Sequence, residues 1–512
     1  MKKYFLLFLL AIFAVSCSKK VEVKGKITGG SPLERIEIVD AAGIATLPLM
    51  NIGVKPDGTF AGDFEAPKNG MYLIDYAGKK NLLYLKKGQT VELNGKAESF
   101  PMEFTAVGDA KANNDFLTKT QKFMADYSMK LNLQEKFGKD EKGFLADLKK
   151  IQTDLEKNID ETAKSTKADD EVVKWKKNDL KTALLSLLPQ YEMYRKQVSG
   201  NPSFKVAKEL KDYEKSLQED KDVLIKEHPL YRDYMINTMA EDFQKFAESA
   251  SNGKPQESTS EMFSKYLKKR TDLSQTVKDY LLSYVMAKSD LNPAVPKETQ
   301  KKILAIIESD IKDTEVKEGL KKVHFAINGV AEGEVAPAAK LVTADGKSYN
   351  IAERKGRPAV MMNYASWTPY INESTIPVLR EVVKFYQDKI DFVFVNFDDT
   401  KEQFAKTSSA LLKGIKGTNV WAEGGLESDF AKKYGIYGFK LAPTFTVLDK
   451  DGKVASKTYF NLGEGELVTL LDKLSGLKAP QVAPEATLQN DLLAPPPPAA
   501  SNPQPEPAPA TK

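Results

Sequence analysis

The stretch PAVMMNYASWTPYI, residues 358–371, decides the fold of the C-terminal part of the chain. Its first half is a continuous apolar run, typical of a strand buried on both faces, and a second such run, DFVFVNF, occupies 391–397. Between them apolar residues repeat at helical spacing, at Leu379, Val382, Val383 and Tyr386. Buried strands that alternate with an amphipathic helix predict an α/β sheet within residues 334–477.

Three further segments occur in a fixed order around these strands. NYASW ends the first strand at 363–367, YGIYG occupies 434–438, and APTFTVLDKDG at 442–452 is typical of a strand that runs into a tight turn. In this order and spacing they resemble the thioredoxin fold and, in detail, the TlpA-like thiol-disulfide oxidoreductases of bacterial envelopes. The resemblance implies a thioredoxin-like domain whose active site follows Trp367 and whose cis-proline loop contains Pro443.

The redox motif of that family is absent. The resemblance places Cys-x-x-Cys directly after the tryptophan, and this chain has Thr368 and Ile371 at the two cysteine positions. Disulfide exchange needs a thiolate at the helix N-terminus and a second thiol one turn later. The only cysteine in the sequence is Cys17, far from this domain. We therefore predict no catalytic residues here, and a protein that is not an enzyme of thiol-disulfide exchange.

The rim of the former active site also departs from the family pattern. Pro377 lies one residue further from Trp367 than the family spacing, and Lys440 and Leu441 are extra residues before Pro443. These changes indicate a reshaped surface. Thioredoxin-like domains bind extended polypeptide here by strand-like hydrogen bonds. The candidate binding groove comprises Trp367, Pro369, Tyr370, Phe439, Ala442 and Pro443. The alternative is that these aromatic side chains only cap the core.

The N-terminus has the pattern of a lipoprotein signal peptide. Lys2 and Lys3 precede an apolar run that is too short for a permanent membrane span. The residues AVSC at 14–17 resemble a bacterial lipobox, which implies removal of residues 1–16. It also implies attachment of diacylglycerol and an N-acyl chain to Cys17. Several acyl chains anchor a protein stably to a membrane. An ordinary signal peptide with an unmodified cysteine is the alternative, and no other cofactor is predicted.

The expected location is the cell envelope. No acidic residue directly follows Cys17, where acidic residues resemble surface-export signals of Bacteroidota-type lipoproteins. We therefore expect an outer-membrane lipoprotein that faces the periplasm. The formal net charge is only +4, and lysines are interspersed with acidic residues. This distribution predicts no nucleic-acid partner.

Residues 17–107 are predicted to form an antiparallel β-sandwich. Short alternating runs such as VEVKG at 21–25 and RIEIV at 35–39 are separated by Gly, Pro, Asn and Asp. The region resembles the domain of unknown function at the N-terminus of Bacteroidota thioredoxin-like lipoproteins. It contains no cluster of catalytic residue types, which favours a binding or spacer role.

Residues 108–330 are predicted to form a helical linker or bundle. One apolar stripe comprises Ile303, Ile307 and Ile311, and another comprises Val173, Leu180, Leu184 and Leu187. Pro189 is expected to end the second helix. His228 and His324 lie far apart in sequence without cysteine partners, so no metal site is predicted.

The last residues, 478–512, are rich in proline and are predicted to be a disordered tail. The whole chain is thus expected to be a multi-domain α+β protein. Two functions remain open. One is a non-catalytic binding or scaffold lipoprotein that contacts an extended polypeptide or another envelope protein. The alternative is a redox accessory that acts with a cysteine-bearing partner.

Overall fold

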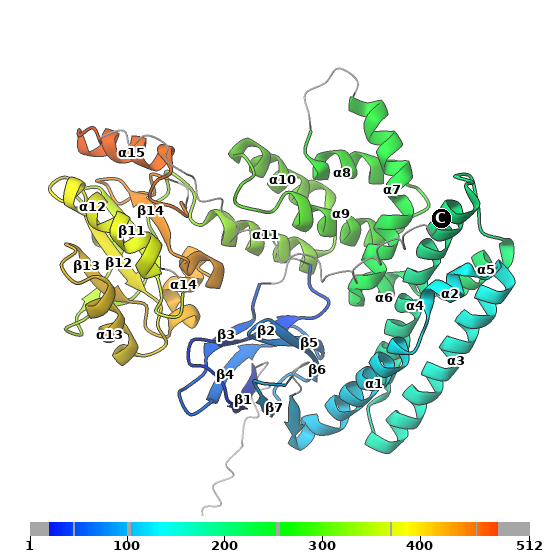
Figure 1. Cartoon of the computed structure of the whole chain (residues 1–512). Coiled ribbons are helices and arrows are strands. Elements are labelled where there is room, and N and C mark those ends of the chain that lie inside the picture. Colours follow the sequence, from blue (N-terminus) through cyan, green and yellow to red (C-terminus); the bar gives the residue numbers. More distant parts are fainter. Residues whose placement is uncertain are drawn as a thin grey trace, which may run out of the picture.

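The structure of the protein is a computed structural model that describes residues 20–44, 47–99, 104–251, 257–368, 371–456 and 458–479. The predicted signal peptide, the lipidation site Cys17, the groove residues Pro369 and Tyr370, and the tail beyond residue 479 lie outside this set. The described chain forms a β-sandwich, a helical region and an α/β domain in sequence order, which confirms the multi-domain α+β class (Figure 1).

The N-terminal sandwich contains two four-stranded sheets, with the orders β4-β1-β7-β8 and β3-β2-β5-β6. The strands are β1 (Lys20–Thr28), β2 (Arg35–Asp40), β3 (Met50–Gly53), β4 (Thr59–Glu65), β5 (Gly70–Tyr76), β6 (Lys79–Leu85), β7 (Thr90–Lys96) and β8 (Thr105–Val107). The predicted antiparallel arrangement is wrong for one described pair, since β1 and β7 run parallel. Parallel pairing needs a long crossover, and the strands between β1 and β7 provide it.

Strand β2 shows how residue alternation separates the two faces of its sheet. Ile36 and Ile38 are fully buried in the sandwich core. Arg35 and Glu37 lie on the opposite face, which is also covered. One part of that face packs on the helical region through Tyr84 of β6, and another part faces the α/β domain. The sandwich therefore presents charged side chains of β2 to the C-terminal domain.

The central region is helical. Its helices are α1 (Lys111–Met129), α2 (Leu133–Gly138), α3 (Glu141–Thr166), α4 (Asp170–Ser199), α5 (Lys208–Ser216), α6 (Lys221–Glu227), α7 (Pro229–Ser251), α8 (Thr259–Lys269), α9 (Gln275–Ser289), α10 (Lys297–Asp310) and α11 (Thr314–Asn328), with the 3-10 turn η1 (Gly108–Ala110) before α1. The predicted stripe of Ile303, Ile307 and Ile311 is fully buried. Helix α11 leads into the α/β domain (Figure 1).

The expected helix end at Pro189 is wrong, because α4 continues through this residue to Ser199. A proline inside a helix removes one backbone hydrogen bond and crowds the preceding turn. Here the helix buries Leu185 and Leu188 before and beside the proline and Tyr191 after it. Burial of large apolar side chains on both sides of Pro189 outweighs the local cost.

The two histidines do not form a metal site with other described residues. His228 is buried and its ring lies 4.9 Å from the ring of Trp175. Burial lowers the pKa of His228 to about 4. His324 lies on α11. Within the described ranges, no group of three or more His, Cys, Asp or Glu residues is placed to hold a metal ion.

The C-terminal domain is built on a sheet of order β10-β9-β13-β12-β11-β14. Its elements are β9 (Leu341–Thr343), β10 (Ser348–Tyr349), η2 (Ile351–Glu353), β11 (Ala359–Tyr364), α12 (Ile376–Tyr386), β12 (Asp391–Asn396), α13 (Lys401–Leu411), β13 (Thr418–Trp421), α14 (Asp429–Tyr434), β14 (Thr444–Leu448) and α15 (Gly465–Ser475). Strands β11, β12 and β13 run parallel, and β14 pairs antiparallel with β11. The two predicted buried strands are confirmed as β11 and β12.

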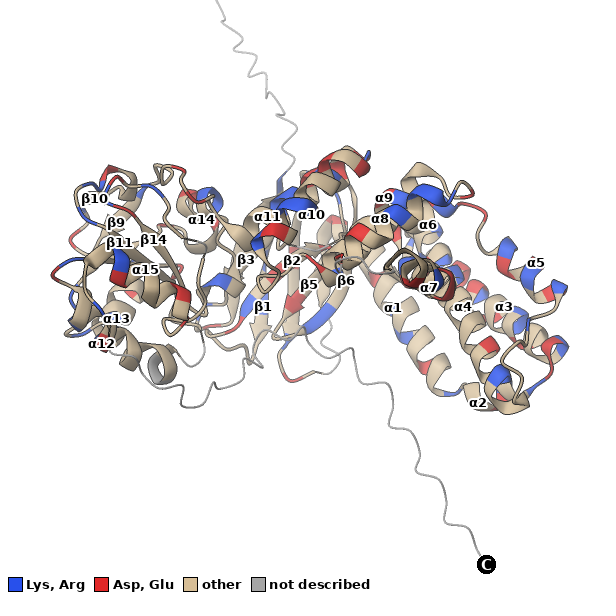
Figure 2. Ribbon diagram, turned by 90° about the horizontal axis from the view of Figure 1, so that it is seen from above, with Lys and Arg blue, Asp and Glu red and all other residues tan. Residues whose placement is uncertain are grey.

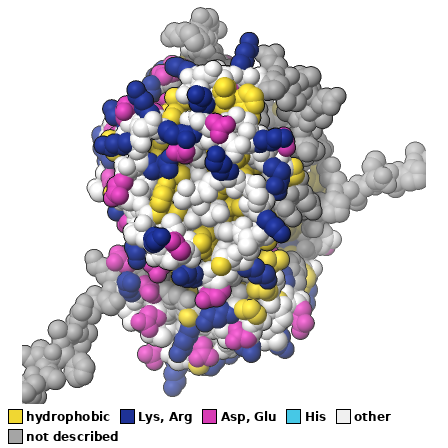
Figure 3. Space-filling view, turned by 90° about the vertical axis from the view of Figure 1, so that its left-hand side faces the viewer, with side chains coloured by type: hydrophobic (Ala, Val, Ile, Leu, Met, Phe, Trp, Pro, Cys, Tyr) yellow, Lys and Arg dark blue, Asp and Glu magenta, His cyan; other side chains and the backbone are white. Residues whose placement is uncertain are grey.

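Charged residues of both signs are spread over all three regions (Figure 2). The face of the α/β domain that points away from the rest of the molecule likewise mixes basic, acidic and apolar side chains (Figure 3). Among the described residues, no helix has the length and apolar character needed to cross a membrane.

Candidate functional site

Thr368, which the resemblance places at the first cysteine position, has a structural role. It follows β11 and Trp367, and its side chain is 6% exposed. Its hydroxyl donates a 2.8 Å hydrogen bond to the carbonyl oxygen of Leu441. Leu441 is one of the two extra residues that the sequence placed before Pro443. The Thr368 hydroxyl thus ties the segment after Trp367 to the loop before Pro443.

The second position, Ile371, belongs to the apolar core. It is 5% exposed and packs in the cluster that contains Leu379 of α12. It begins the π-helical turn η3 (Ile371–Thr375), which leads directly into α12. A π-turn holds one more residue than an α-turn, which is consistent with the predicted one-residue shift of Pro377. Pro369 and Tyr370, between the two positions, are not described.

Lys440 and Leu441, which we predicted to be extra residues, are the last two residues of the 3-10 helix η5 (Gly438–Leu441). Lys440 and Leu441 are both fully buried, whereas Phe439 is 39% exposed. Burial lowers the pKa of the Lys440 ammonium to about 7. Its Nζ has no hydrogen-bond partner among the described residues. The loop thus has an apolar, exposed tip and an unpaired amine beneath it.

The described groove candidates differ in accessibility. Trp367 is half-buried, Phe439 and Ala442 are exposed, and Pro443 is buried. Trp367 and Phe439 line the same small cavity, so the structure brings these two together. Pro443 and Ala442 are not among the residues that line it.

A buried carboxylate that we did not predict holds the loop after β11. Asp398 is fully buried at the carboxyl end of β12. It accepts hydrogen bonds from the backbone N–H of Ser366 at 2.7 Å and from the hydroxyl of Thr407 at 2.7 Å. The sequence did contain a signal for Asp398, because this residue follows a predicted buried strand, and polar residues at the carboxyl ends of adjacent parallel strands meet at one edge of the sheet.

The N-terminal sandwich is joined to this site by Arg35. Its guanidinium makes a bidentate ion pair with Asp399, with N–O distances of 2.8 and 3.0 Å. The guanidinium carbon also lies 4.5 Å from the ring centre of Trp367, a cation-π contact. Asn51 of β3 accepts from the same guanidinium. The sandwich therefore covers one side of the former active site. No sequence signal links residues 364 positions apart.

Beside this ion pair, the backbone of each domain lies close to a side chain of the other domain at a glycine. A Cβ atom added at Gly53 would lie 2.4 Å from a carboxylate oxygen of Asp399, and one at Gly438 would lie 3.5 Å from the amide nitrogen of Asn51. Real Cβ atoms do not approach other atoms as closely as 2.4 Å. Glycine at position 53 is thus what allows Asp399 to reach Arg35.

A cavity of about 370 Å³ remains between the sandwich and the α/β domain. The sandwich contributes a row of polar side chains that lie opposite one another on four adjacent strands, in the order Asn51, Glu37, Asp75 and Lys80. The α/β domain contributes Trp367, Tyr437, Gly438 and Phe439. Burial raises the pKa of the Glu37 carboxyl, and the nearby charge of Asp75 raises it further.

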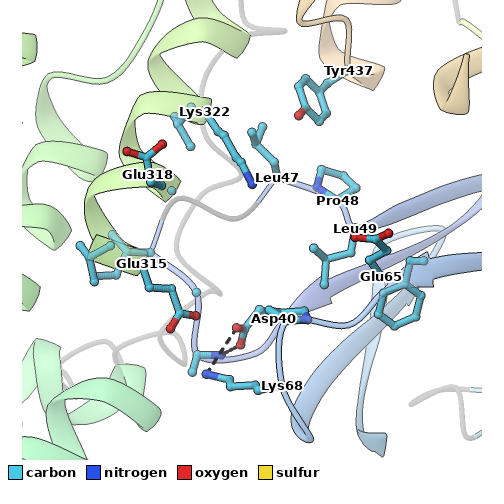
Figure 4. A pocket seen from close by; sticks show the side chains of 18 of the residues that line it. Asp40, Leu47, Pro48, Leu49, Glu65, Lys68, Glu315, Glu318, Lys322 and Tyr437 are labelled. Atoms are coloured by element: carbon cyan, nitrogen blue, oxygen red, sulfur yellow. Dashed lines mark hydrogen bonds and ion pairs between the residues drawn. The ribbon is translucent and has the colours of Figure 1, made fainter. Parts of the chain in front are cut away.

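A second, larger cavity of about 990 Å³ lies where the three regions meet. Figure 4 shows Glu318 and Lys322 of α11 on one side, the loop at Leu47 and Pro48 beside them, and Tyr437 at the far end. Its walls mix carboxylates, lysines and apolar side chains. Because the lining contains both carboxylates and amines, it does not favour a ligand of one particular charge.

The comparisons with known proteins concern the C-terminal domain. Residues 331–469 match the Redoxin family model. The solved C-terminal domain of a predicted thiol-disulfide oxidoreductase from Bacteroides thetaiotaomicron is 26% identical, over 28% of this chain and 97% of that one, with a TM-score of 0.25. A thiol-disulfide oxidoreductase from Bacteroides fragilis is 24% identical, over 27% of this chain and 98% of that one, with a TM-score of 0.24.

The thioredoxin domain of a thiol-disulfide oxidoreductase from Bacteroides vulgatus is 21% identical, over 28% of this chain and 99% of that one, with a TM-score of 0.25. No curated protein matches the sequence. The family match and the sheet order together confirm the predicted thioredoxin-like domain. The matched segment contains no cysteine.

Proposed function

We propose that this chain, in which a redoxin-type domain keeps its fold without its redox cysteines, is a non-catalytic, lipid-anchored binding protein of the cell envelope. The observation that carries the proposal is the bond from the Thr368 hydroxyl to Leu441. The burial of Ile371 in the core supports the same interpretation, in which both predicted cysteine positions serve packing. A site kept for thiol chemistry would not need either contact.

The proposed contact surface is the rim of the former active site. Phe439 and Ala442 are exposed there, next to the region where thioredoxin-like domains pair with extended polypeptide. Arg35 occupies part of the same site by its contact with Trp367. A polypeptide or envelope partner would therefore meet a composite surface of the sandwich and the thioredoxin-like domain.

The anchor in this proposal is lipid on Cys17, with the protein on the periplasmic side of the outer membrane. A chain expressed in a bacterial host with an alkyne-tagged fatty acid should incorporate the tag and partition into the membrane fraction. Cys17→Ser should abolish both, because the thioether requires the thiol. Equal labelling of the two chains would contradict the anchor.

The absence of redox catalysis is tested by insulin reduction with dithiothreitol as the electron donor. The chain with Cys17→Ser should give no turnover above buffer, because it contains no thiol. The same chain with Thr368→Cys and Ile371→Cys is the matched control that restores both family positions. Its turnover would show that the fold can support the chemistry. Turnover by the cysteine-free chain would overturn the proposal.

A further inference from the structure

The cavity between the sandwich and the thioredoxin-like domain carries chemistry that the proposed function does not use. Glu37 and Asp75 are directly opposite on β2 and β5. Like charges in this arrangement repel and destabilise a sheet. Both carboxylates line the cavity, together with the aromatic side chains of Trp367, Tyr437 and Phe439. Two carboxylates that repel each other thus lie side by side on the part of the sheet that faces the thioredoxin-like domain.

The cations near this pair do not neutralise it fully. The charge of Arg35 is engaged by the bidentate contact with Asp399. Lys80 lies 3.9 Å from Asp75, at the limit of an ion pair, and its side chain is 60% exposed. Glu37 accepts a hydrogen bond from the amide of Asn51, which carries no charge. Glu37 is half-buried and forms no ion pair among the described residues, although the charges of Arg35 and Lys80 favour its ionised form.

The opposite wall of the cavity suits a cation as well. Aromatic faces attract ammonium and guanidinium groups, most strongly where water is excluded. Trp367 already stacks with one guanidinium, that of Arg35, at 4.5 Å. Tyr437 and Phe439 add two further aromatic side chains to this wall.

We propose that this cavity binds an organic cation, a guanidinium or alkylammonium group, between the carboxylates of Glu37 and Asp75 and the aromatic wall of the thioredoxin-like domain. A volume of about 370 Å³ is that of a small-molecule site and accommodates one basic side chain. The cation comes either from a free small molecule or from a lysine or arginine of a polypeptide. The inference holds whether or not the domain has residual redox activity.

Isothermal titration of the Cys17→Ser chain tests the site with two probes. Butylguanidinium represents the free cation, and the tripeptide acetyl-Gly-Arg-Gly-amide represents a side chain. Saturable binding of either probe supports the proposal, and the probe that binds more tightly identifies the source of the cation. Butylurea and the citrulline peptide, the neutral isosteres, should not bind. No saturable binding of either cation, or equal binding of the neutral isosteres, would overturn the proposal.

Two variants locate the site. Glu37→Gln and Asp75→Asn keep the shape of the side chains and should each weaken binding at least tenfold, about 1.4 kcal/mol. Glu98→Gln, at an exposed carboxylate of the sandwich outside the cavity, should leave the affinity unchanged. Unaltered affinity in both cavity variants would place the ligand elsewhere and refute the assignment. If a variant does not fold, the proposal is still tested by the comparison of each cation with its neutral isostere, because that comparison uses the chain in which Glu37 and Asp75 are intact.

Discussion

Replacement of Lys440 by methionine is expected to stabilise the protein by roughly 4 kcal/mol at pH 7. Lys440 is fully buried in η5, and its Nζ has no hydrogen-bond partner among the described residues. Burial alone lowers its pKa from 10.5 to about 7. Each unit of pKa difference corresponds to about 1.36 kcal/mol. Methionine fills a similar volume without a group that must give up its proton or its hydration.

The pH dependence distinguishes this cause from better packing. Below pH 7 both the folded and the unfolded chain hold the proton on Lys440, so the full cost of burial is present. Between pH 7 and pH 10.5 only the unfolded chain binds it, and the stability of the wild type therefore rises with pH. The free-energy advantage of Lys440→Met over the wild type should thus shrink steadily across this range.

Urea unfolding of both chains at pH 6, 7.5 and 9 measures that advantage. Lys450→Met is the matched control at an exposed lysine of the same domain and should change the free energy of unfolding by less than about 0.5 kcal/mol. A pH-independent gain for Lys440→Met would mean that packing alone is responsible. A loss of stability would mean that the Nζ has a favourable partner in solution.

The parts of the fold that sequence predicted well are those fixed by local periodicity. Strands β11 and β12 are buried along almost their whole length, and continuous apolar runs identify such strands directly. The expected helix end at Pro189 failed for the opposite reason. The packing of Leu185, Leu188 and Tyr191 against distant helices decided the outcome, and that packing is not visible in the local pattern.

The candidate site likewise combines features that are visible in the local sequence with features that depend on contacts between distant segments. The sequence assigned Thr368 and Ile371 to the cysteine positions, and marked Lys440 and Leu441 as extra residues, by landmarks of the family, and this assignment stays a prediction. The sequence could not show that the Thr368 hydroxyl bonds to Leu441, since this depends on the path of the loop. The sequence also could not show that Arg35 contacts Trp367 and Asp399, because a contact between separate domains leaves no periodic pattern in either domain.

The ion pair between Arg35 and Asp399 should control how tightly the sandwich is held on the thioredoxin-like domain. The side chain of Arg35 is 8% exposed and that of Asp399 is 30% exposed. Removal of one partner from a largely buried pair leaves the other charge unpaired, which is strongly destabilising. Because Asp399 is partly solvated, we expect Asp399→Asn to cost the domain contact about 2 kcal/mol, below the range for a fully buried pair.

Hydrogen exchange at the amides of Trp367 and Gly438 measures this contact. A loss of about 2 kcal/mol should speed exchange there roughly 30-fold if the amides exchange by separation of the two domains. Asp345→Asn removes the carboxylate of an exposed ion pair, with Lys347, in the same domain, and should leave these rates unchanged.

A steric variant tests the same contact without a change in charge. Gly53→Ala places a methyl group 2.4 Å from the Asp399 carboxylate, so the sandwich or Asp399 must move, and the same two amides should again exchange faster. The double variant Arg35→Met with Asp399→Asn should exchange more slowly than Asp399→Asn alone, because no unpaired buried charge remains. If Asp399→Asn and Gly53→Ala both leave exchange at Trp367 unaltered, the two domains are held together by other contacts, and the cover over the former active site does not depend on Arg35.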